Sequence, residues 1–408
     1  MPASGPPKTP GERTSLDGLA RPAFWLCAVV GAAGLGAAYA LGNARGDGLK
    51  YFFHSYLLNY CYFLSISLGA LFFVALQHAT RAGWSVTVRR LAELLAANVP
   101  WLALLALPVV VPVLLGNTAL YTWTDPAAVA GAELLRHKAP YLNPTAFALR
   151  CVFYFGVWGL LGRFFLVQSL RQDDSGERAL TQRMERFSPV ALLLFALTVT
   201  FASFDLLMSL EPDWFSTIFG VYYFSGAAVG FLAAIILAAM LLQATGRLSR
   251  SITVEHYHDL GKLLLAFVIF WGYIAFSQYM LIWYANIPEE TSWYLVRQRG
   301  PWLWVSLILL FGHLLIPFFG LLSREVKRRK VTLGFWAVWL LVAHWIDLYW
   351  LVMPSLGPGS VPPGLVDAAS LVGIGGLYLA GVVLLAGRCP LVPLADPRLE
   401  EALAFENS

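Results

Sequence analysis

Long apolar stretches recur along the chain and alternate with short segments rich in glycine, proline and charged residues. A helix of about 20 consecutive apolar residues spans the hydrocarbon core of a bilayer. Stretches of this kind lie near residues 22–41, 51–77, 93–115, 144–170, 188–210, 216–243, 257–285, 302–323, 331–353 and 366–386. The pattern therefore predicts an all-α integral membrane protein with about ten transmembrane helices.

The composition agrees with this prediction. Of 408 residues, 58% are hydrophobic and 13% are charged, whereas about a quarter of the residues in a soluble domain are charged. Water-soluble enzyme classes are therefore excluded. Residues 1–21 and 387–408, at the two ends of the chain, are expected to be polar tails, and residues 22–386 are expected to form a membrane domain. The motif AYA at 38–40 also fits a signal-peptidase site, but the length of the first stretch and the spans that follow it favour a helix.

Lysine and arginine are distributed unevenly among the segments between the predicted helices. Nineteen of the 28 lie in the two tails and in the loops near 78–92, 171–187, 244–256 and 324–330, and six lie in the loops of the opposite side. Lysine and arginine favour the cytoplasmic side of a membrane. Both termini are therefore expected to be cytoplasmic, which agrees with an even number of spans. Pro100, Pro108 and Pro112 are expected to kink the third helix.

Two of the predicted helices end in a similar way, with SFDLLMSLEP in one and HWIDLYWLVMP in the other. Asp205 and Asp347 are 142 positions apart, as are Pro212 and Pro354. This spacing predicts a parallel internal repeat of two four-helix bundles. The first bundle would contain helices 2–5 (residues 51–210), the second helices 6–9 (residues 216–353), and helices 1 and 10 would flank them.

Ionisable residues lie near the middle of several predicted helices. His344 and Asp347 are one helical turn apart in the ninth helix, His313 lies in the eighth, and Asp205 lies in the fifth. Ionisable groups are costly inside a membrane and commonly mark ion or proton pathways. Because a short loop joins the eighth and ninth helices, His313, His344 and Asp347 are expected to meet in one bundle.

The start of the seventh helix carries a second ionisable group, in the sequence EHYHDLGK. Its members are Glu255, His256, His258, Asp259 and Lys262. Histidine titrates near neutral pH, so these residues could form the cytoplasmic entrance of a proton path to His313, His344 and Asp347. The alternative is that the same groups are fixed hydrogen-bond partners that hold helices together.

Aromatic residues are mixed with acids and prolines in the segments 209–224 and 284–294. A quinone needs flat apolar walls and a few hydrogen-bond donors. The residues that could supply such a cleft are Trp214, Tyr222, Tyr223, Trp283 and Tyr284. The alternative is an ordinary belt of interfacial aromatic residues that contacts partner proteins.

The sequence predicts no metal site and no redox cofactor bound by this chain. Cys27, Cys61, Cys151 and Cys389 are far apart and form no CxxC or CxxCH motif. Iron–sulfur clusters and c-type haem need clustered cysteines. Two histidines on adjacent helices also raise the possibility of b-type haem, but a two-haem bundle needs four well-placed histidines, and the chain does not offer them.

The motifs of residues 188–354 resemble those of a known family. SFDLLMSLEPDWFSTIFGVYYF, EHYHDLGKLLLAFVIFWGYIAFSQYMLIWYANIPEET, LLFGHLLIPF and HWIDLYWLVMP occur in this order. They are similar to the second of the two quinone-binding membrane proteins of alternative complex III, a respiratory quinol:cytochrome c oxidoreductase. Those proteins have the fold of the polysulfide-reductase (NrfD-like) membrane family. The remainder of the chain agrees with that family in arrangement more than in wording.

The resemblance implies a multi-pass component of an electron-transport complex in the bacterial inner (cytoplasmic) membrane. Its partners would be an iron–sulfur subunit, multihaem and monohaem cytochrome c subunits, a homologous membrane subunit and a terminal oxidase. The haem c groups and iron–sulfur clusters would lie on those partners. In that family the quinol site beside the iron–sulfur chain is attributed to the homologous membrane subunit, so quinone or quinol is only an optional ligand of this chain. The resemblance implies a structural role for this chain and a role in proton translocation for Asp205, His313, His344 and Asp347. Two rival interpretations are a stand-alone secondary transporter or ion channel and a purely structural membrane scaffold.

Overall fold

The computed structural model describes residues 12–357 and 361–407 of the chain. In this described part the ordered elements are helices, and ten of them are long and apolar enough to cross a membrane. The prediction of an all-α integral membrane fold is thereby confirmed. The predicted polar tail at 1–21 lies largely outside the described residues, since the description begins at residue 12 and α1 already begins at Ala20.

The ten spans correspond closely to the ten predicted apolar stretches. Eight consist mainly of a single helix: α16, described below, and α1 (Ala20–Ala44), α2 (Lys50–Ala79), α8 (Pro144–Ser175), α9 (Arg178–Leu206), α10 (Phe219–Ala244), α11 (Val254–Ala285) and α17 (Leu365–Ala386). The third span is divided into α3 (Val86–Ala96), α4 (Val99–Leu105) and α5 (Leu107–Leu114). The eighth comprises α13 (Gly300–Ile308), the π-helical segment η3 (Leu309–Leu315) and α14 (Ile316–Leu322), and the ninth is α16 (Lys330–Val352).

Short helices connect these spans or follow them. They are η1 (Thr122–Thr124), α6 (Pro126–Gly131), α7 (Glu133–Lys138), η2 (Met208–Leu210), α12 (Pro288–Arg297), α15 (Arg324–Arg328), η4 (Met353–Leu356) and α18 (Leu399–Leu403). Proline explains the breaks in the third span. Pro100 and Pro108 lie in the first turns of α4 and α5, where the missing N–H of proline has no helical partner to lose.

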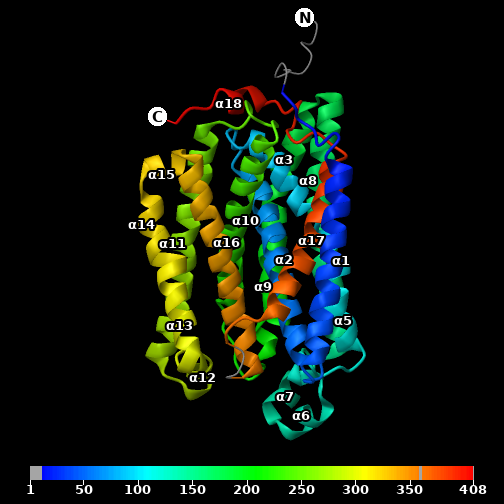
Figure 1. Cartoon of the computed structure of the whole chain (residues 1–408), viewed down its shortest axis with the longest axis vertical. Helices are drawn as coiled ribbons and strands as arrows, with labels where there is room; N and C mark the ends of the chain where they lie inside the picture. Colours follow the sequence, from blue (N-terminus) through cyan, green and yellow to red (C-terminus); the bar gives the residue numbers. More distant parts are fainter. Residues whose placement is uncertain (1–11, 358–360, 408) are drawn as a thin grey trace, which may run out of the picture.

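Helices α2 and α10 form the centre of the molecule and pack against each other. The first group of helices contains α2, α3, α8 and α9, and the second contains α10, α11, α14 and α16 with η3. Helix α17 packs on α2, and α1 packs on α17 at the edge (Figure 1). In its most apolar window, α2 is 89% buried and α1 is 11% buried. A helix that is apolar on all sides, such as α2, is therefore enclosed by protein.

The ends of the spans separate into two sets. The start of α1, the starts of α3 and α11 and the C-terminal segment with α18 lie at one end, and α6, α7 and α12 lie at the other (Figure 1). The basic loops thus share one end of the bundle. The assignment of that end to the cytoplasm remains a prediction based on charge.

Two predicted loops are shorter in the structure than in the sequence pattern. Helix α3 begins at Val86, so Arg89 and Arg90 are helical and buried, although the sequence pattern placed them in a loop. Helix α9 begins at Arg178, well before the expected residue 188. Polar ends of helices that extend beyond the membrane lack a long apolar run, and for this reason hydropathy underestimates their length.

Candidate functional site

Asp347 lies at the centre of the second group of helices. Its side chain is buried, with 2% of the residue exposed. The hydroxyl of Tyr222 on α10 donates a hydrogen bond to Oδ1 at 2.5 Å, and Nε1 of Trp271 on α11 donates one to Oδ2 at 3.1 Å. Three helices, α10, α11 and α16, therefore meet at one carboxyl group.

His344 lies one turn before Asp347 on α16 and is also buried. Its Nε2 forms a hydrogen bond of 2.8 Å with Oγ of Ser65, which belongs to α2 in the first group. The ring fits against Gly226 and Gly230 of α10, because a Cβ atom at Gly230 would lie 2.7 Å from Cδ2 of His344. The imidazole thus joins the two groups of helices where two glycines leave room for it.

His313 lies in the π-helical segment η3 and is fully buried. Its ring stacks on Trp271, with 3.9 Å between the centroids. Neither ring nitrogen has a hydrogen-bond partner within the described residues. Trp271 therefore contacts both His313 and Asp347, and the expected meeting of His313, His344 and Asp347 occurs around it. Single-turn π segments of this kind occur frequently at functional sites.

Asp205, the counterpart of Asp347 in the apparent repeat, has a different environment. Arg150 on α8 binds it in a bidentate manner, with both nitrogen–oxygen distances at 2.8 Å, and the hydroxyl of Tyr154 donates a hydrogen bond at 2.7 Å. The hydropathy pattern assigns no role to Arg150 or Tyr154. The signal that could have found them is their spacing of four residues, which places both side chains on one helix face within an apolar run.

A cavity of about 390 Å³ adjoins Asp347. Tyr222 and Trp271, the two hydrogen-bond donors to Asp347, both form part of its wall. Phe276, Leu303 and Leu310 line the cavity as well, and each has an exposed side chain on the outer surface of its span. The cavity is therefore accessible from the lipid side and reaches the two residues that donate hydrogen bonds to the buried carboxyl group.

Arg297 of α12 closes this cavity at the end of the bundle. It is fully buried, and its guanidinium donates hydrogen bonds to the carbonyls of Trp350 and Leu351 at the end of α16 and to Glu211. Burial lowers the pKa of Arg297, and Glu211 acts in the opposite direction. In the sequence Arg297 is one of the charges of a loop, and its burial was not predicted, because hydropathy carries no information on burial outside a span.

The five aromatic residues predicted to form a quinone cleft are not gathered in one place. Tyr222 lines the cavity, whereas Tyr223 donates a hydrogen bond to the carbonyl of Cys61 on α2. Trp214 is buried and stacks on Trp293 with 4.4 Å between centroids. Trp283 and Tyr284 are 65% and 84% exposed at the end of α11. A role of these residues with a quinone remains a prediction, and the cavity wall contains only Tyr222 of the five.

Two ion pairs and a helix cap hold the predicted entrance group at the start of α11. Glu255 pairs with Arg328 at 2.5 Å, and Asp259 pairs with Lys262. Nδ1 of His256 accepts a hydrogen bond of 3.1 Å from the backbone N–H of Thr253, which caps the helix.

The entrance group and the buried site lie at different levels of the bundle. His258 is 7% exposed and lies in the first turns of α11, beside Asp259. Asp259 and Trp271 are separated along α11 by roughly 18 Å. The buried residues on this length are Leu260, Gly261, Leu264 and Val268. The structure therefore separates the entrance group from the site around Asp347 by an apolar segment.

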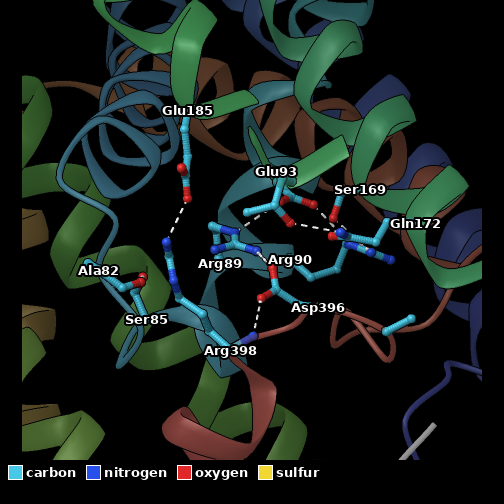
Figure 2. A network of polar contacts seen from close by, with 12 residues as sticks. Ala82, Ser85, Arg89, Arg90, Glu93, Ser169, Gln172, Glu185, Asp396 and Arg398 are labelled. Atoms are coloured by element: carbon cyan, nitrogen blue, oxygen red, sulfur yellow. Dashed lines mark hydrogen bonds and ion pairs between the residues drawn. The ribbon is translucent and has the colours of Figure 1, made fainter. Parts of the chain in front are cut away.

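A second polar network, which the sequence did not predict, lies at the start of α3 (Figure 2). Arg89 pairs with Glu93 at 3.4 Å and with Asp396 of the C-terminal segment, and Arg90 pairs with Glu93 at 2.9 Å and with Asp173 at 2.8 Å. Each of these buried charges has a partner of opposite sign. The network therefore attaches the segment after α17 to the first group of helices.

Within the described residues, no group of three or more histidine, cysteine or acidic side chains is arranged to hold a metal ion. Comparison with protein-family models found no matching family, and comparison with curated proteins found no matching sequence. The fold and the site define a polytopic helical membrane protein. Its distinctive feature is a buried carboxyl and imidazole cluster beside a cavity that faces the lipid.

Proposed function

We propose that this chain is an integral membrane subunit of a respiratory quinol:cytochrome c oxidoreductase of the alternative complex III type. In this proposal it holds no redox centre of its own, and the cluster around Asp347 carries protons during quinol oxidation. The observation that carries the proposal is a buried acid in the middle of a membrane bundle whose hydrogen-bond donors are the uncharged side chains of Tyr222 and Trp271.

The contrast between the two related acids supports a proton-carrying role for Asp347 in particular. The charge of Asp205 is compensated by Arg150 at 2.8 Å, so proton uptake there would break a buried ion pair at a large cost. Asp347 can take up or release a proton without breaking an ion pair in the described structure. His344 and His313 lie beside it, and imidazole is suited to proton transfer near neutral pH.

The cavity beside Asp347 supports quinol as the ligand. Oxidation of a quinol to a quinone releases two electrons and two protons. Tyr222 lies in the cavity wall and its hydroxyl donates a hydrogen bond to Asp347, so this residue connects a ligand in the cavity to the buried carboxyl group. In this proposal the electrons pass to the cofactors of an iron–sulfur protein and of c-type cytochromes, and from there to cytochrome c or a terminal oxidase.

The first experiment is purification in mild detergent, followed by mass spectrometry of the associated proteins and a visible spectrum. We expect an iron–sulfur protein and c-type cytochromes to accompany the chain. A colourless, monodisperse protein without partners would contradict the proposal and would favour a stand-alone transporter or channel.

The second experiment measures protons released on each side of the membrane per quinol oxidised by the reconstituted complex. We expect Asp347→Asn to lower the oxidation rate, and with it the rate of proton release, at least about a hundredfold, the lower range for removing a group that transfers protons. Asp213→Asn, at an exposed acid in the loop before α10, is the matched control and should behave as the wild type. An unchanged oxidation rate and proton yield in a fully assembled Asp347→Asn complex would instead favour a purely structural scaffold.

A further inference from the structure

The segment 324–330, which joins α14 to α16, carries a high concentration of positive charge. Its cations are Arg324, Lys327, Arg328, Arg329 and Lys330, and its acid is Glu325. The segment 171–187 contains four arginines as well, but they are accompanied by four acids, so its formal charge is zero. The formal charge of the segment 324–330 is +4, as large as the net charge of the whole chain. Positive charge at this end of the bundle is therefore strongest beside α14 and α16.

The fold itself uses two of these cations. Nζ of Lys327 donates hydrogen bonds to the carbonyl oxygens of Leu321 and Leu322, which end α14. Arg328 forms the ion pair with Glu255 of α11. Both side chains therefore hold the segment against the helices, and the other three cations remain for a partner outside the chain.

Arg324, Arg329 and Lys330 are exposed, and their partners within the chain are weak. Arg329 pairs with Glu325 at 3.7 Å, with both side chains at least 70% exposed, and exposed ion pairs contribute little stability. Arg324 and Lys330 donate hydrogen bonds to uncharged oxygen atoms, a backbone carbonyl and the amide of Gln243. A phosphate group could therefore replace these partners at small cost.

An exposed apolar stripe begins directly beside these cations on α16. Val331 follows Lys330 in the chain and is 86% exposed. Phe335, Trp339 and Val342 are exposed as well, and they follow at the spacing of three or four residues that defines one helix face. The stripe is roughly 16 Å long, about the depth of one leaflet of the hydrocarbon core. It therefore matches the length over which an acyl chain extends below its head group.

Helix α14 packs beside this stripe and borders it. A Cβ atom at Gly320 of α14 would overlap the ring of Trp336 on α16, and Nε1 of Trp339 donates a hydrogen bond to the carbonyl of Gly312 in η3. Phe319, next to the first of these contacts, is exposed, and α14 lies at the edge of the bundle (Figure 1). The stripe and the aromatic ring beside it thus form one surface toward the lipid.

We infer that the exposed cations of the segment 324–330 and the stripe on α16 form a binding site for an anionic phospholipid, of the phosphatidylglycerol type. The phosphate pairs with the three exposed cations, and one acyl chain follows the stripe from Val331 to Val342. Basic residues beside a membrane helix attract anionic lipids, and the open stripe favours a lipid over a soluble anion. The inference is independent of the proposed function, because no residue of the cluster around Asp347 takes part.

The test is native mass spectrometry of the full chain, with any partner proteins that accompany it, from nanodiscs with equal amounts of phosphatidylglycerol, phosphatidylethanolamine and phosphatidylcholine. The three lipids share a phosphate and acyl chains, but the last two have no net charge. We expect phosphatidylglycerol to be retained with at least about a tenfold preference, since each basic residue near an anionic head group strengthens its binding several-fold. Added salt should reduce the preference, because it screens exposed charges.

Two variants test the two parts of the site. Arg324→Gln/Arg329→Gln/Lys330→Gln removes the exposed cations and should abolish the preference. Val331→Asp places an anion at the start of the stripe and should abolish it as well. An acid in the first turn of α16 is compatible with the helix, so the second variant remains informative if the first does not fold.

Arg171→Gln/Arg178→Gln/Arg186→Gln is the matched control. It removes three exposed arginines at the same end of the bundle and changes the net charge as much as the triple site variant, so it should retain the wild-type preference. Equal retention of the three lipids by the wild type, an unchanged preference in either site variant, or an equal loss in the control would overturn the inference. Displacement of the lipid by inorganic phosphate, but not by chloride at the same ionic strength, would also overturn it, because the site would then bind a soluble anion.

Discussion

At the scale of single residues, Asp205 and Asp347 occupy related positions but have different partners. Asp205 is held by a guanidinium and a phenol, and Asp347 is held by a phenol and an indole. The sequence showed that both acids lie in membrane helices at matched positions. It could not show which acid is paired, because Arg150 is 55 positions from Asp205 and the pairing depends on how α8 and α9 pack.

The ion pair of Asp205 leads to a first prediction. Arg150→Met leaves Asp205 buried without a cation, which should lower the free energy of unfolding by about 3 kcal/mol. The double variant Arg150→Met/Asp205→Asn should recover most of that loss, because it removes the uncompensated charge. Thermal unfolding of the detergent-solubilised protein measures both. Arg163→Met, at an exposed position of the same helix, is the control, and equal losses in the single and double variants would argue against the pairing.

At the scale of secondary-structure elements, hydropathy and proline predicted the ten spans and the breaks in the third. The π-helical segment η3 was not predicted, although it carries His313. Its sequence, LLFGHLL, has no proline and has the same apolar character as the helices around it. A π segment arises from how a helix fits against its neighbours, so that the local pattern of residues carries no signal for it.

The crossing of α1 and α17 leads to a second prediction at this scale. The two helices approach so closely that a Cβ atom at Gly376 would lie 2.6 Å from the backbone nitrogen of Gly31. Gly376→Ala should therefore separate α1 from α17 and destabilise this contact by about 1–3 kcal/mol, as for other overpacked sites.

The native cysteines report on that separation. In Gly376→Ala, Cys27 on α1 should react faster with N-ethylmaleimide, while the buried Cys61 on α2 should react as in the wild type. Gly36→Ala, where a Cβ atom on α1 would meet nothing within 4 Å, should change neither rate. A faster reaction at both cysteines would show that the whole fold has loosened and would contradict a local effect.

At the scale of the whole molecule, the two groups of helices are joined by α2 and α10 in the membrane and by the C-terminal segment at one end. This segment contacts Arg89 through Asp396 and Glu185 through Arg398, and farther along, Asn407 donates hydrogen bonds to Glu255 on α11. It therefore extends from the first group of helices to the second (Figure 1). The sequence pattern predicted only a polar tail there.

A third prediction concerns this segment. Asp396→Asn removes a buried charge that faces Arg89 and should lower the free energy of unfolding by about 3 kcal/mol. Limited proteolysis should then cleave the C-terminal segment before the spans unfold. Asp174→Asn, at an exposed acid in the last turn of α8, is the control. Wild-type resistance of the segment in Asp396→Asn would show that the network around Arg89 does not hold it.

The sequence by itself determined the membrane class, the ten spans and the presence of acids and histidines within them. Exposure of polar groups to lipid is costly, so each span must be a continuous run of mostly apolar residues, and such a run is visible in the sequence. Tertiary structure decided which of those groups are paired. It also decided that Arg89, Arg90 and Arg297 are buried and that a cavity adjoins Asp347. These features depend on contacts between helices that are far apart in the chain, and a pattern of residues along the chain does not contain them.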